Sequence, residues 1–553
     1  MKWLSTHDRE GTLDYLKNNQ FDLLVIGGGI TGCGIALDAA SRGLKTALVE
    51  RDDFASGTSS RSTKLIHGGL RYLKQFEIML VREMGRERAV LNRLAPHLVR
   101  SEKMLLPIMK EGTLGKFTTS VGLMVYDLLA GVESEDQRQM LDREETLAME
   151  PLLESEDLEG AAVYAEYRTD DARLTIEVMK TAVSYGAVCM NYLTAEDFLY
   201  NDKKVAGIKA RDVFTKNEFE INARYVVNAA GPWVDELRSI NNSLEGKRVH
   251  LSKGVHIVVP KEKFPLQTAV YFDSHDERMV FAIPRGAVTY IGTTDTDFQG
   301  SPSQVLAEKE DVTYLLKAVN RVFKTVDLVS EDVISSWAGL RPLIHEEGKD
   351  VGEMSRKDEV FISGSGLVSI AGGKLTGYRK MAEKIIDTVL EMNEDNGDSF
   401  HGLKKECITD DVPLTENAFA GEQELKTYQR GMINRLKDCS LSEEDAFYLV
   451  SNYGRQCEQV LDLLKEIEGK DVQLSLLKAE ALFTIDRELV NTLADLFVRR
   501  TGRLYFNIDS VKKCYKTVAD FMAKQLKWDK KRKKREIEFM EELICQAGLE
   551  VKE

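Results

Sequence analysis

The sequence predicts an α/β fold in which a largely parallel sheet is joined by a second, antiparallel sheet and followed by an all-α C-terminal domain. Three observations carry this prediction. An apolar run, a glycine-rich loop and a helical pattern follow one another near the N-terminus, as in a βαβ unit. Alternating apolar runs fill residues 249–294, and the pattern beyond residue 404 is almost wholly helical. With 553 residues, the chain is expected to form two or three domains.

The first βαβ unit begins at Phe21–Ile26, an unbroken apolar run typical of a strand that is buried on both faces. The loop Gly27-Gly28-Gly29-Ile30-Thr31-Gly32 follows at once, and a helix is expected over Cys33–Arg42. Lys45–Val49 forms the second strand, which Glu50 closes 18 residues after Gly32. Strand, loop, helix, strand and terminal acid thus arrive in the order of a dinucleotide-binding unit.

Each of these residues has a chemical purpose in such a unit. Gly27 permits the tight turn, Gly29 lets the backbone approach a pyrophosphate, and Gly32 allows close packing of helix on strand. The helix N-terminus offers N–H groups and a partial positive charge to the pyrophosphate. Glu50 can accept hydrogen bonds from the adenosine ribose. A simple βα turn is the alternative interpretation, and the complete order of elements disfavours it.

The fingerprint alone does not choose between FAD and NAD. Two features favour FAD: the unit starts close to the N-terminus, and a polar loop of small residues, Phe54–Arg61, follows it. That loop leads into Ser62–Tyr72 and can wrap the rest of a long flavin nucleotide. Small residues at Ala229–Trp233 allow another close approach. Gly372-Gly373 precedes a predicted helix, whose dipole can stabilise negative charge on a reduced flavin ring.

Composition excludes several classes of protein. The formal net charge of −15 argues against general nucleic-acid binding, which needs a basic surface. The seven cysteines form no CxxC pair and have no metal-ligand spacing to histidine, so neither a metal site nor a disulfide framework is expected. Residues 1–20 are polar, unlike a signal peptide, and no run approaches the ~20 apolar residues of a membrane span. We expect a cytoplasmic protein, with attachment to the inner face of the cell membrane left open.

Further elements can be placed from the apolar periodicity. Helices are expected at Glu77–Arg93, across most of residues 113–150 and at Asp170–Tyr185. Short strands are expected at Val188–Tyr192, Lys204–Arg211, Glu218–Ala223 and, as a separate buried strand, Arg224–Asn228. A polar break at residues 393–403 precedes the C-terminal domain, where the expected helices include Glu443–Asn452, Cys457–Ile467, Leu474–Ala481, Arg487–Arg500 and Ser510–Lys527.

Several segments together resemble the FAD-dependent, aerobic and quinone-linked glycerol-3-phosphate dehydrogenase family of the D-amino-acid-oxidase-like flavoproteins. The resemblance covers essentially the whole chain. It rests on the segments GGGITG with Glu50, SSRSTKLIHGGLRYL, NAAGPW, KGVHIVVP, YIGTTD, GLRPL and SIAGGKLTGYRKMAE. Lys64–Tyr72 and Gly372–Arg379, with the helical C-terminal domain, separate this family from the amino-acid and sarcosine oxidases.

The resemblance implies a Rossmann-like FAD-binding domain, an antiparallel-sheet substrate domain and an all-α C-terminal domain. The expected division is an N-terminal extension at 1–20, a discontinuous FAD-binding domain at 21–90, 150–245 and 340–395, a substrate (cap) domain at 91–149 and 246–339, and a helical domain at 404–553.

The resemblance also implies an activity. The family oxidises sn-glycerol 3-phosphate at C2 to dihydroxyacetone phosphate, with hydride transfer to flavin N5 and electron transfer to a membrane quinone, in glycerol catabolism. It also suggests a homodimer. The nearest alternative is an oxidase that passes electrons to O₂, although the insertion typical of those enzymes is not seen. A non-catalytic flavoprotein that senses a phosphometabolite is the alternative of another class.

The substrate's phosphate dianion requires clustered cations. Positions that match the family supply Arg71, Arg341 and Lys374, with Tyr72 as a hydroxyl donor. His67 is the candidate base, because the ordinary pKa of histidine leaves much of it neutral at cytoplasmic pH. Arg341 is given a phosphate-binding or alkoxide-stabilising role. Outside the family context, His67 would be an ordinary loop residue, and Arg71 and Lys374 would be surface charges.

Other polar residues of these segments are left with less specific roles. His250 and His256 are expected to be either structural or adjacent to the substrate, and Thr293–Asp295 to fix a turn. No residue is expected to bind a metal. The positions expected to bind FAD are Gly27, Gly29, Ile30, Thr31, Gly32, Glu50, Arg51, Ser59, Ser60, Ser62, Lys64, Leu65, His67, Ala229, Ala230, Gly231, Trp233, Gly372, Gly373, Lys374, Leu375 and Thr376.

A basic segment near the C-terminus reverses the overall charge. Residues 524–535 hold eight basic residues and one acid, with Trp528 among them. One interpretation is contact with anionic lipid headgroups. The other, slightly favoured, is a solvated helix face balanced by the glutamates at positions 536, 538, 541 and 542.

Overall fold

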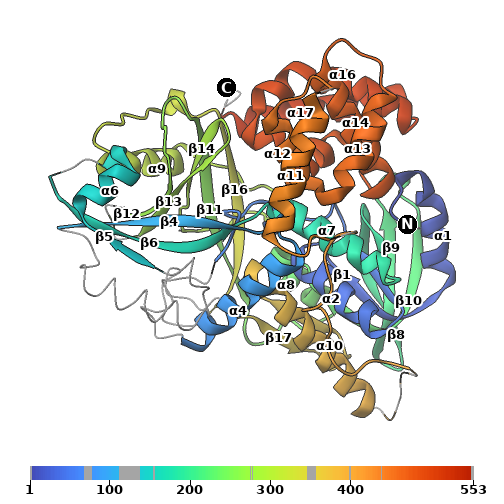
Figure 1. Cartoon of the computed structure of the whole chain (residues 1–553). Coiled ribbons are helices and arrows are strands. Elements are labelled where there is room, and N and C mark those ends of the chain that lie inside the picture. Colours follow the sequence, from blue (N-terminus) through green and yellow to red (C-terminus); the bar gives the residue numbers. More distant parts are fainter. Residues whose placement is uncertain are drawn as a thin grey trace.

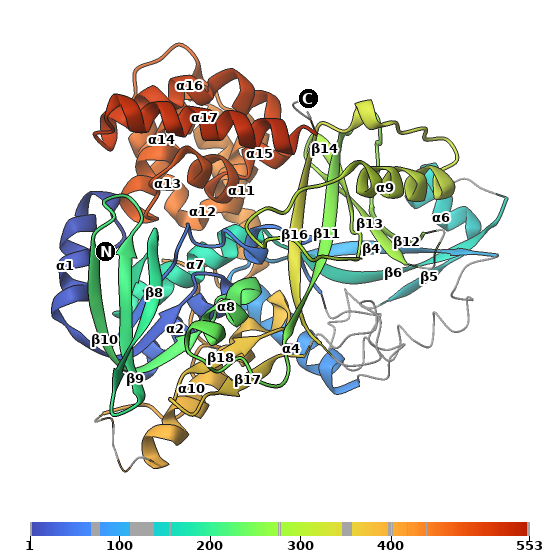
Figure 2. The ribbon, with the colours of Figure 1, turned by 180° about the vertical axis from the view of Figure 1, so that it is seen from behind.

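Two sheets and a bundle of helices build the protein (Figure 1). The computed structural model describes residues 3–67, 78–110, 138–153, 156–274, 276, 278–345, 357–395, 397, 400, 402–416, 418–437 and 439–549. The first sheet lies beneath the helical bundle, and the second sheet lies beside both (Figures 1 and 2). The predicted α/β class with a helical C-terminal region is confirmed.

The first sheet is largely parallel. β1 (Gln20–Ile26) lies at its centre and pairs in parallel with β2 (Thr46–Val49) on one side and β10 (Glu218–Asn228) on the other. The two strands expected at 218–223 and 224–228 are one strand: residues 222–228 pair with β1, and residues 218–222 pair with the neighbouring antiparallel strand. The other strands of this sheet are β7 (Val188–Met190), β8 (Leu193–Asn201), β9 (Lys204–Asp212), β17 (Glu359–Ile362) and β18 (Val368–Ala371).

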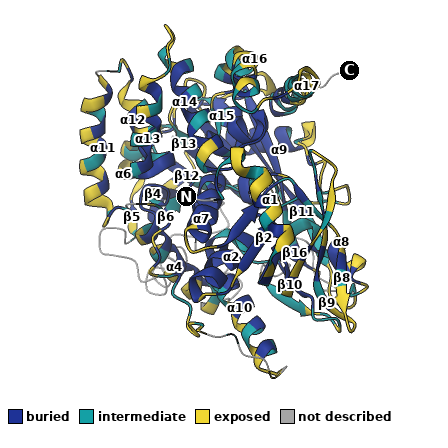
Figure 3. Ribbon diagram, turned by 90° about the vertical axis from the view of Figure 1, so that its right-hand side faces the viewer, coloured by how far each residue is buried: buried dark blue, intermediate teal, exposed yellow. Residues whose placement is uncertain are grey.

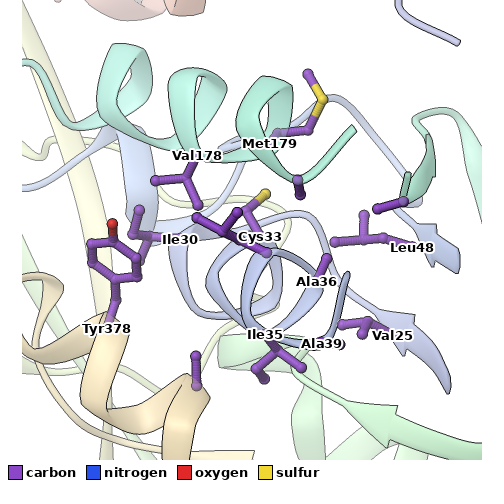
Figure 4. Packing of buried hydrophobic residues seen from close by; sticks show 14 of the residues in the cluster. Val25, Ile30, Cys33, Ile35, Ala36, Ala39, Leu48, Val178, Met179 and Tyr378 are labelled. Atoms are coloured by element: carbon purple, nitrogen blue, oxygen red, sulfur yellow. The ribbon is translucent and has the colours of Figure 1, made fainter. Parts of the chain in front are cut away.

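A three-helix layer covers this sheet. The central helix α2 (Ile30–Arg42) packs between α7 (Asp171–Ser184) and α10 (Tyr378–Asp395), so residues distant in sequence enclose it (Figure 4). Gly34 permits the contact with α10, because a Cβ there would lie 2.7 Å from the Tyr378 ring. Figure 3 shows that α2 and α7 are buried, whereas α11 exposes one side.

The second sheet is largely antiparallel, as predicted. β11 (Val249–Pro260) pairs antiparallel with β14 (Val288–Gly292) and with β16 (Ser335–Ile344). The only parallel pair within the described sheet joins β12 (Ala269–Asp273) to β4 (Arg100–Met109). Its remaining strands are β3 (Leu65–Ile66), β5 (Gln139–Leu141), β6 (Leu158–Arg168), β13 (Met279–Arg285) and β15 (Thr296–Asp297).

Three strands of the second sheet lie wholly or partly outside the segments expected to build it: β3, which pairs with β6, then β6 itself and the end of β16. The division by sequence places residues 150–245 and 340–395 in the FAD-binding domain. β6 instead pairs with β4 along ten residues of that strand, and the last residues of β16 continue its ladder with β11. These long-range pairings, which no local pattern reveals, place all three strands in the second sheet.

Predicted helices outside the C-terminal domain are partly confirmed. α4 (Ile78–Leu94) and α7 agree with the expected ranges. Of the expected helical region 113–150, residues 113–137 lie outside the described residues. The rest contains β5 followed by α6 (Arg143–Met149), which a capping box from Asp142 starts. α9 (Lys309–Val322) packs on the second sheet through β11.

The C-terminal bundle differs from prediction at one place. The helix expected at 487–500 is partly wrong: α14 ends at Arg487, and helical geometry returns only at residues 493–494, which lead into the π-helical turn Asp495–Arg500. The chain leaves helical geometry because Leu489 adopts a φ of +55° and Asp495 accepts hydrogen bonds from the N–H groups of Asn491 and Thr492. The other helices are α11 (Glu422–Lys437), α12 (Glu443–Tyr453), α13 (Cys457–Lys465), α14 (Val472–Arg487), α15 (Arg503–Phe506), α16 (Ile508–Gln525) and α17 (Lys530–Ala547).

The bundle and the N-terminal segment both attach to the sheets. The Ser335 hydroxyl of β16 donates to the Tyr505 carbonyl of α15, and α17 also contacts β16. The N-terminal segment forms α1 (Arg9–Asn18), and Arg9 makes a 2.6 Å ion pair with Asp212 at the end of β9. Among the described residues, none of the helices combines the length and the apolar character needed to span a bilayer.

Candidate cofactor and substrate site

The glycine loop joins β1 to α2 at the carboxyl end of the first sheet. Gly27 has a φ of +114°, and its N–H donates to the Val49 carbonyl of β2 at 2.9 Å. A Cβ on Gly32 would lie 1.9 Å from the Gly27 carbonyl oxygen, so only glycine permits this approach. The loop is therefore drawn tightly against the sheet, and the N-terminus of α2 lies beside the strand ends, where open α/β sheets bind ligands.

The start of α2 is covered by a side chain from the loop after β2. Gly29 is the N-cap residue and has no side chain to cap the helix. The Ile30 N–H instead donates to the Ser59 hydroxyl at 3.0 Å, and a Cβ on Gly29 would come within 3.2 Å of that hydroxyl. The loop expected to wrap the cofactor thus lies against the helix N-terminus, which is the expected pyrophosphate position.

Glu50 follows β2 and lies next to the glycine loop. Its half-buried carboxylate accepts the Gly28 N–H at 2.6 Å and the Asp52 N–H at 2.8 Å. Arg51 lies over the Trp233 ring, 4.8 Å from the ring centroid. Trp233 also faces Gly57, where a Cβ would lie 3.1 Å from the ring. The structure thereby brings three predicted cofactor residues to one end of the loop: Glu50, Arg51 and Trp233.

Two of the predicted cofactor residues, Lys64 and Ser62, donate hydrogen bonds to the Asp171 carboxylate. The Lys64 ammonium lies 2.5 Å from the Asp171 carboxylate, and the Ser62 hydroxyl donates to the other oxygen at 2.7 Å. Both Lys64 and Asp171 are buried. Because Asp171 begins α7, this ion pair fastens the segment that leads toward His67 to the helix layer. Lys64 and Ser62 therefore support that segment through Asp171.

The segment that ends at His67 contacts the segment that begins at Lys374. The Thr376 hydroxyl donates to the His67 carbonyl at 3.3 Å, and the His67 ring lies 6.2 Å from the Phe281 ring of β13. Lys374 is the N-cap residue of a 3₁₀ turn, Leu375–Gly377, that precedes α10. Gly372 and Gly373 have φ values of +81° and +77°, and a Cβ on either would clash with neighbouring atoms at 2.5 Å or less.

Arg341 projects from β16 and is held by the segment after β14. Its guanidinium donates to the Thr293 hydroxyl at 2.9 Å and the Thr294 carbonyl at 3.2 Å, and it lies 3.3 Å from the Asp295 carboxylate. Gly254 leaves room for it, since a Cβ there would lie 2.3 Å from the guanidinium. Thr293–Asp295 was expected to fix a turn. The structure adds that this segment orients Arg341, whose side chain is 20% exposed.

His250 and His256, whose roles the sequence left undecided, differ in their surroundings. His250 lies 2.9 Å from the Asp297 carboxylate near the sheet surface. His256 is buried, stacks on the Trp337 ring at 4.8 Å and lies 3.0 Å from the Thr63 hydroxyl through Nε2. Burial, with a contribution from Arg341, lowers the pKa of His256 well below its usual value. His256 is therefore a neutral residue that packs beneath the segment leading to His67.

The remaining predicted positions fall into two groups. Arg71 and Tyr72 lie outside the described residues, so their place in a phosphate site stays a prediction. The other predicted cofactor positions lie on the same segments as the residues above: Thr31 on α2, Ser60 and Leu65 on the loop and strand before His67, Ala229, Ala230 and Gly231 after β10, and Leu375 before α10.

Sequence reasoning missed a buried carboxylate in the loop after β2. Asp53 is fully buried and accepts hydrogen bonds from Arg499 at 2.5 Å and from Arg500 at 2.7 and 3.0 Å. The Asn191 amide donates to it at 2.9 Å. The two arginines lie on the π-helical turn of the C-terminal bundle, more than 440 residues away. The one available signal was an Arg-Arg pair that closes the apolar run LADLFV.

Comparisons with known proteins agree with this geometry. Residues 22–379 match the family of FAD dependent oxidoreductases, and residues 407–533 match the C-terminal domain of alpha-glycerophosphate oxidase. The aerobic glycerol-3-phosphate dehydrogenase of Bacillus subtilis (strain 168) is 47% identical over 546 residues, which cover 98% of both chains. The enzyme of the same name from Staphylococcus aureus (strain USA300) is 46% identical over 548 residues, again with 98% of both chains covered.

Solved structures extend the comparison to three dimensions. The glycerol-3-phosphate dehydrogenase from Bacillus halodurans complexed with FAD superposes with a TM-score of 0.85 at 41% identity, covering 100% of this chain and 99% of that one. L-alpha-Glycerophosphate oxidase from Mycoplasma pneumoniae, at 17% identity and a TM-score of 0.53, shares the fold over 67% of this chain and 95% of its own. This chain belongs to the FAD-dependent oxidoreductases and, within them, to the family of the aerobic glycerol-3-phosphate dehydrogenases.

Proposed function

We propose that this protein oxidises sn-glycerol 3-phosphate at C2 to dihydroxyacetone phosphate and delivers the electrons to a membrane quinone. The observation that carries the proposal is the 47% identity, over 98% of both chains, to a protein named aerobic glycerol-3-phosphate dehydrogenase. The site supports the proposal because the chain provides His67, Arg341 and Lys374, on three separate segments, in addition to the dinucleotide-binding loop.

The residues around the glycine loop fit FAD. The positive φ of Gly27 and the close packing of Gly32 present the α2 N-terminus, which would hold the pyrophosphate. Glu50 would accept the ribose hydroxyls. Burial, followed by repulsion from Asp52, raises the pKa of Glu50 to about 7. When bound, FAD supplies the acceptor for the hydride that leaves C2.

We assign the substrate chemistry to His67, Arg341 and Lys374, which lie on segments other than the glycine loop. His67 would take the proton of the C2 hydroxyl as the hydride departs, because a neutral imidazole can accept it near neutral pH. Arg341 would bind the phosphate or the developing alkoxide, since a guanidinium stays charged and cannot serve as a base. Lys374, together with Arg71 and Tyr72, would complete the phosphate site.

The proposed electron acceptor is a membrane quinone, which separates this enzyme from an O₂-using oxidase. The names of the relatives favour the dehydrogenase. A peripheral position on the membrane and a homodimer complete the proposal. For contact with lipid, α17 offers Lys530, Lys531 and Lys534, which are all exposed. Lys533 pairs with Asp520 at 2.6 Å, so part of the basic segment is neutralised within the bundle.

Anaerobic addition of sn-glycerol 3-phosphate tests the reaction itself. We expect the visible absorbance of the bound flavin to bleach, because the substrate reduces it in the absence of any acceptor. Aerobic turnover with a soluble quinone should then yield little peroxide. Persistent absorbance would reject the enzyme in favour of a binding protein, and peroxide formed in proportion to turnover would identify an oxidase.

Replacement of the proposed base should impair chemistry without removing the cofactor. We expect His67→Asn to lower kcat by about 10²- to 10⁴-fold, the usual contribution of a positioned acid or base. The flavin spectrum should stay that of the wild type. His250→Asn, which alters a histidine near the start of β11, is the matched control and should turn over normally. Near wild-type kcat in His67→Asn would remove His67 from this role.

The raised pKa of Glu50 makes FAD binding pH-dependent. Ribose hydroxyls favour the ionised carboxylate, so FAD binding should lower the pKa of Glu50 and release a proton. Below the apoprotein value of about 7, FAD affinity should rise with pH by at most about tenfold per unit, and it should level off above that value. Titration of apoprotein with FAD from pH 5.5 to 8.5 checks this. Glu50→Gln should flatten the profile, and a wild-type profile that is already flat would contradict the assignment.

The exposed lysines of α17 allow a test of membrane contact. If they bind anionic lipid, the variant Lys530→Gln/Lys531→Gln/Lys534→Gln should lose about 1 kcal/mol of binding per residue in co-sedimentation with phosphatidylserine-containing vesicles. Lys203→Gln/Lys204→Gln/Lys216→Gln, which alters exposed lysines at the two turns that flank β9, is the control. Equal sedimentation of both variants and the wild type would reject the basic segment as the anchor.

A further inference from the structure

We propose that Arg499 and Arg500 are positioning residues of the FAD site, which act through Asp53 to hold the loop after β2 in its cofactor-binding conformation. The C-terminal helical bundle is then an integral part of the FAD site as well as a neighbouring domain. The inference rests on FAD binding at the glycine loop and is independent of the substrate.

The contact between the two domains converges on the Asp53 carboxylate. Arg500 donates to both of its oxygens, at 2.7 and 3.0 Å, and Arg499 donates to one of them at 2.5 Å. Asp53 and Arg500 have no exposed side-chain surface, and Arg499 is 10% exposed. A bidentate guanidinium contact fixes both the position and the orientation of a carboxylate. The loop is therefore held at one point by two cations of another domain.

The π-helical turn explains how neighbouring arginines reach the same carboxylate. In an α-helix, successive side chains point about 100° apart, because 3.6 residues complete a turn. Asp495–Arg500 forms a wider π-helical turn, a geometry often found at functional sites. Asp495 starts this turn and also accepts the Tyr192 hydroxyl at 2.5 Å. Since Tyr192 follows β7 of the first sheet, the turn is fastened to the nucleotide-binding half at both ends.

Asp53 is linked directly to the residues that would contact FAD. It lies three residues after Glu50, and the next residues fold back on the glycine loop. The Ala55 N–H donates to the Gly28 carbonyl at 2.9 Å. Phe54 covers Gly28, where a Cβ would lie 2.7 Å from its ring. A displacement of Asp53 would consequently move Phe54 and Ala55 away from the glycine loop and disturb Glu50.

The loop depends on the arginines for an electrostatic reason. Burial by itself would raise the pKa of Asp53, but Arg500 and then Arg499 outweigh burial and lower that pKa to about 2. Asp53 is thus a buried charge that is compensated from outside its own domain. Removing the compensating cations leaves a charge that drives the loop toward solvent. Removing a cation from an ion pair that lies wholly within the bundle should not displace the loop after β2.

FAD affinity of the apoprotein tests the proposal, with titrations followed by quenching of flavin fluorescence. We expect Asp53→Asn and Arg500→Gln each to raise the FAD dissociation constant about tenfold, as when the competent loop falls to roughly a tenth of molecules. The double variant should be no worse than either single variant. Arg500→Lys should recover part of the affinity. If Asp53→Asn does not fold, Arg499→Gln replaces it with the same expected result.

Arg503→Gln is the matched control, because Arg503 makes a buried 2.9 Å ion pair with Glu480 inside the same bundle and does not contact the loop. Its thermal stability should fall while its FAD dissociation constant stays that of the wild type. Wild-type affinity in Asp53→Asn and Arg500→Gln would overturn the proposal. An equal loss of affinity in Arg503→Gln would do the same, since the effect would then be general destabilisation. A wild-type apoprotein that fails to bind FAD would instead reject the cofactor site.

Discussion

The loop after β2, the end of the first sheet and the helical bundle meet at one buried carboxylate, that of Asp53. A charge in this position costs several kcal/mol of desolvation unless cations and hydrogen-bond donors surround it. Arg499, Arg500 and Asn191 supply these donors. Because the donors come from two domains, the docking of the bundle and the conformation of the loop are one event. The glycine loop in turn packs against residues fixed by that event.

A second buried network makes the docking broader than a single contact. Arg173 of α7 makes a bidentate contact with Glu488 at 2.6 and 2.9 Å, and Lys180 lies 2.8 Å from Glu177 in the same helix. Glu488 also lies 3.5 Å from Arg500, so the two networks are continuous. The helix that packs on α2 is therefore joined by charge to the bundle. Buried ion pairs therefore join the nucleotide-binding half to the bundle at both α7 and the loop after β2.

The substrate side of the site is assembled by pairing between distant strands. β16 places Arg341 opposite the residues after β14, and Thr293–Asp295 restrains its guanidinium. The contact between His67 and Thr376 brings the segment after the first βαβ unit to the N-terminus of α10. The proposed substrate residues thus come from both sheets: Arg341 projects from β16 of the second sheet, whereas Lys374 follows β18 of the first sheet.

Local sequence patterns predicted the parts of this arrangement that local physics determines. The strand, glycine loop, helix and Glu50 follow from apolar runs and from backbone needs of a few consecutive residues. Asp53, Arg499 and Arg500 were missed because their roles arise from a contact across more than 440 residues. The helix predicted at 487–500 is interrupted because Leu489 has a φ of +55° and Asp495 accepts the N–H groups of Asn491 and Thr492, which the apolar pattern does not reveal. β6 belongs to the second sheet and not to the expected FAD-binding domain, because strand pairing is decided by contacts between residues distant in sequence.

Amide hydrogen exchange of the wild-type apoprotein tests the coupling of loop and bundle most directly. If the buried carboxylate fixes the loop before FAD arrives, amides of residues 54–56 should be protected in the apoprotein. They should also lose that protection together with residues 495–500 as denaturant is added, because one opening event exposes both. Rapid exchange of residues 54–56 beside a fully protected turn at 495–500 would contradict the account, since the loop would then move independently of the domain proposed to hold it.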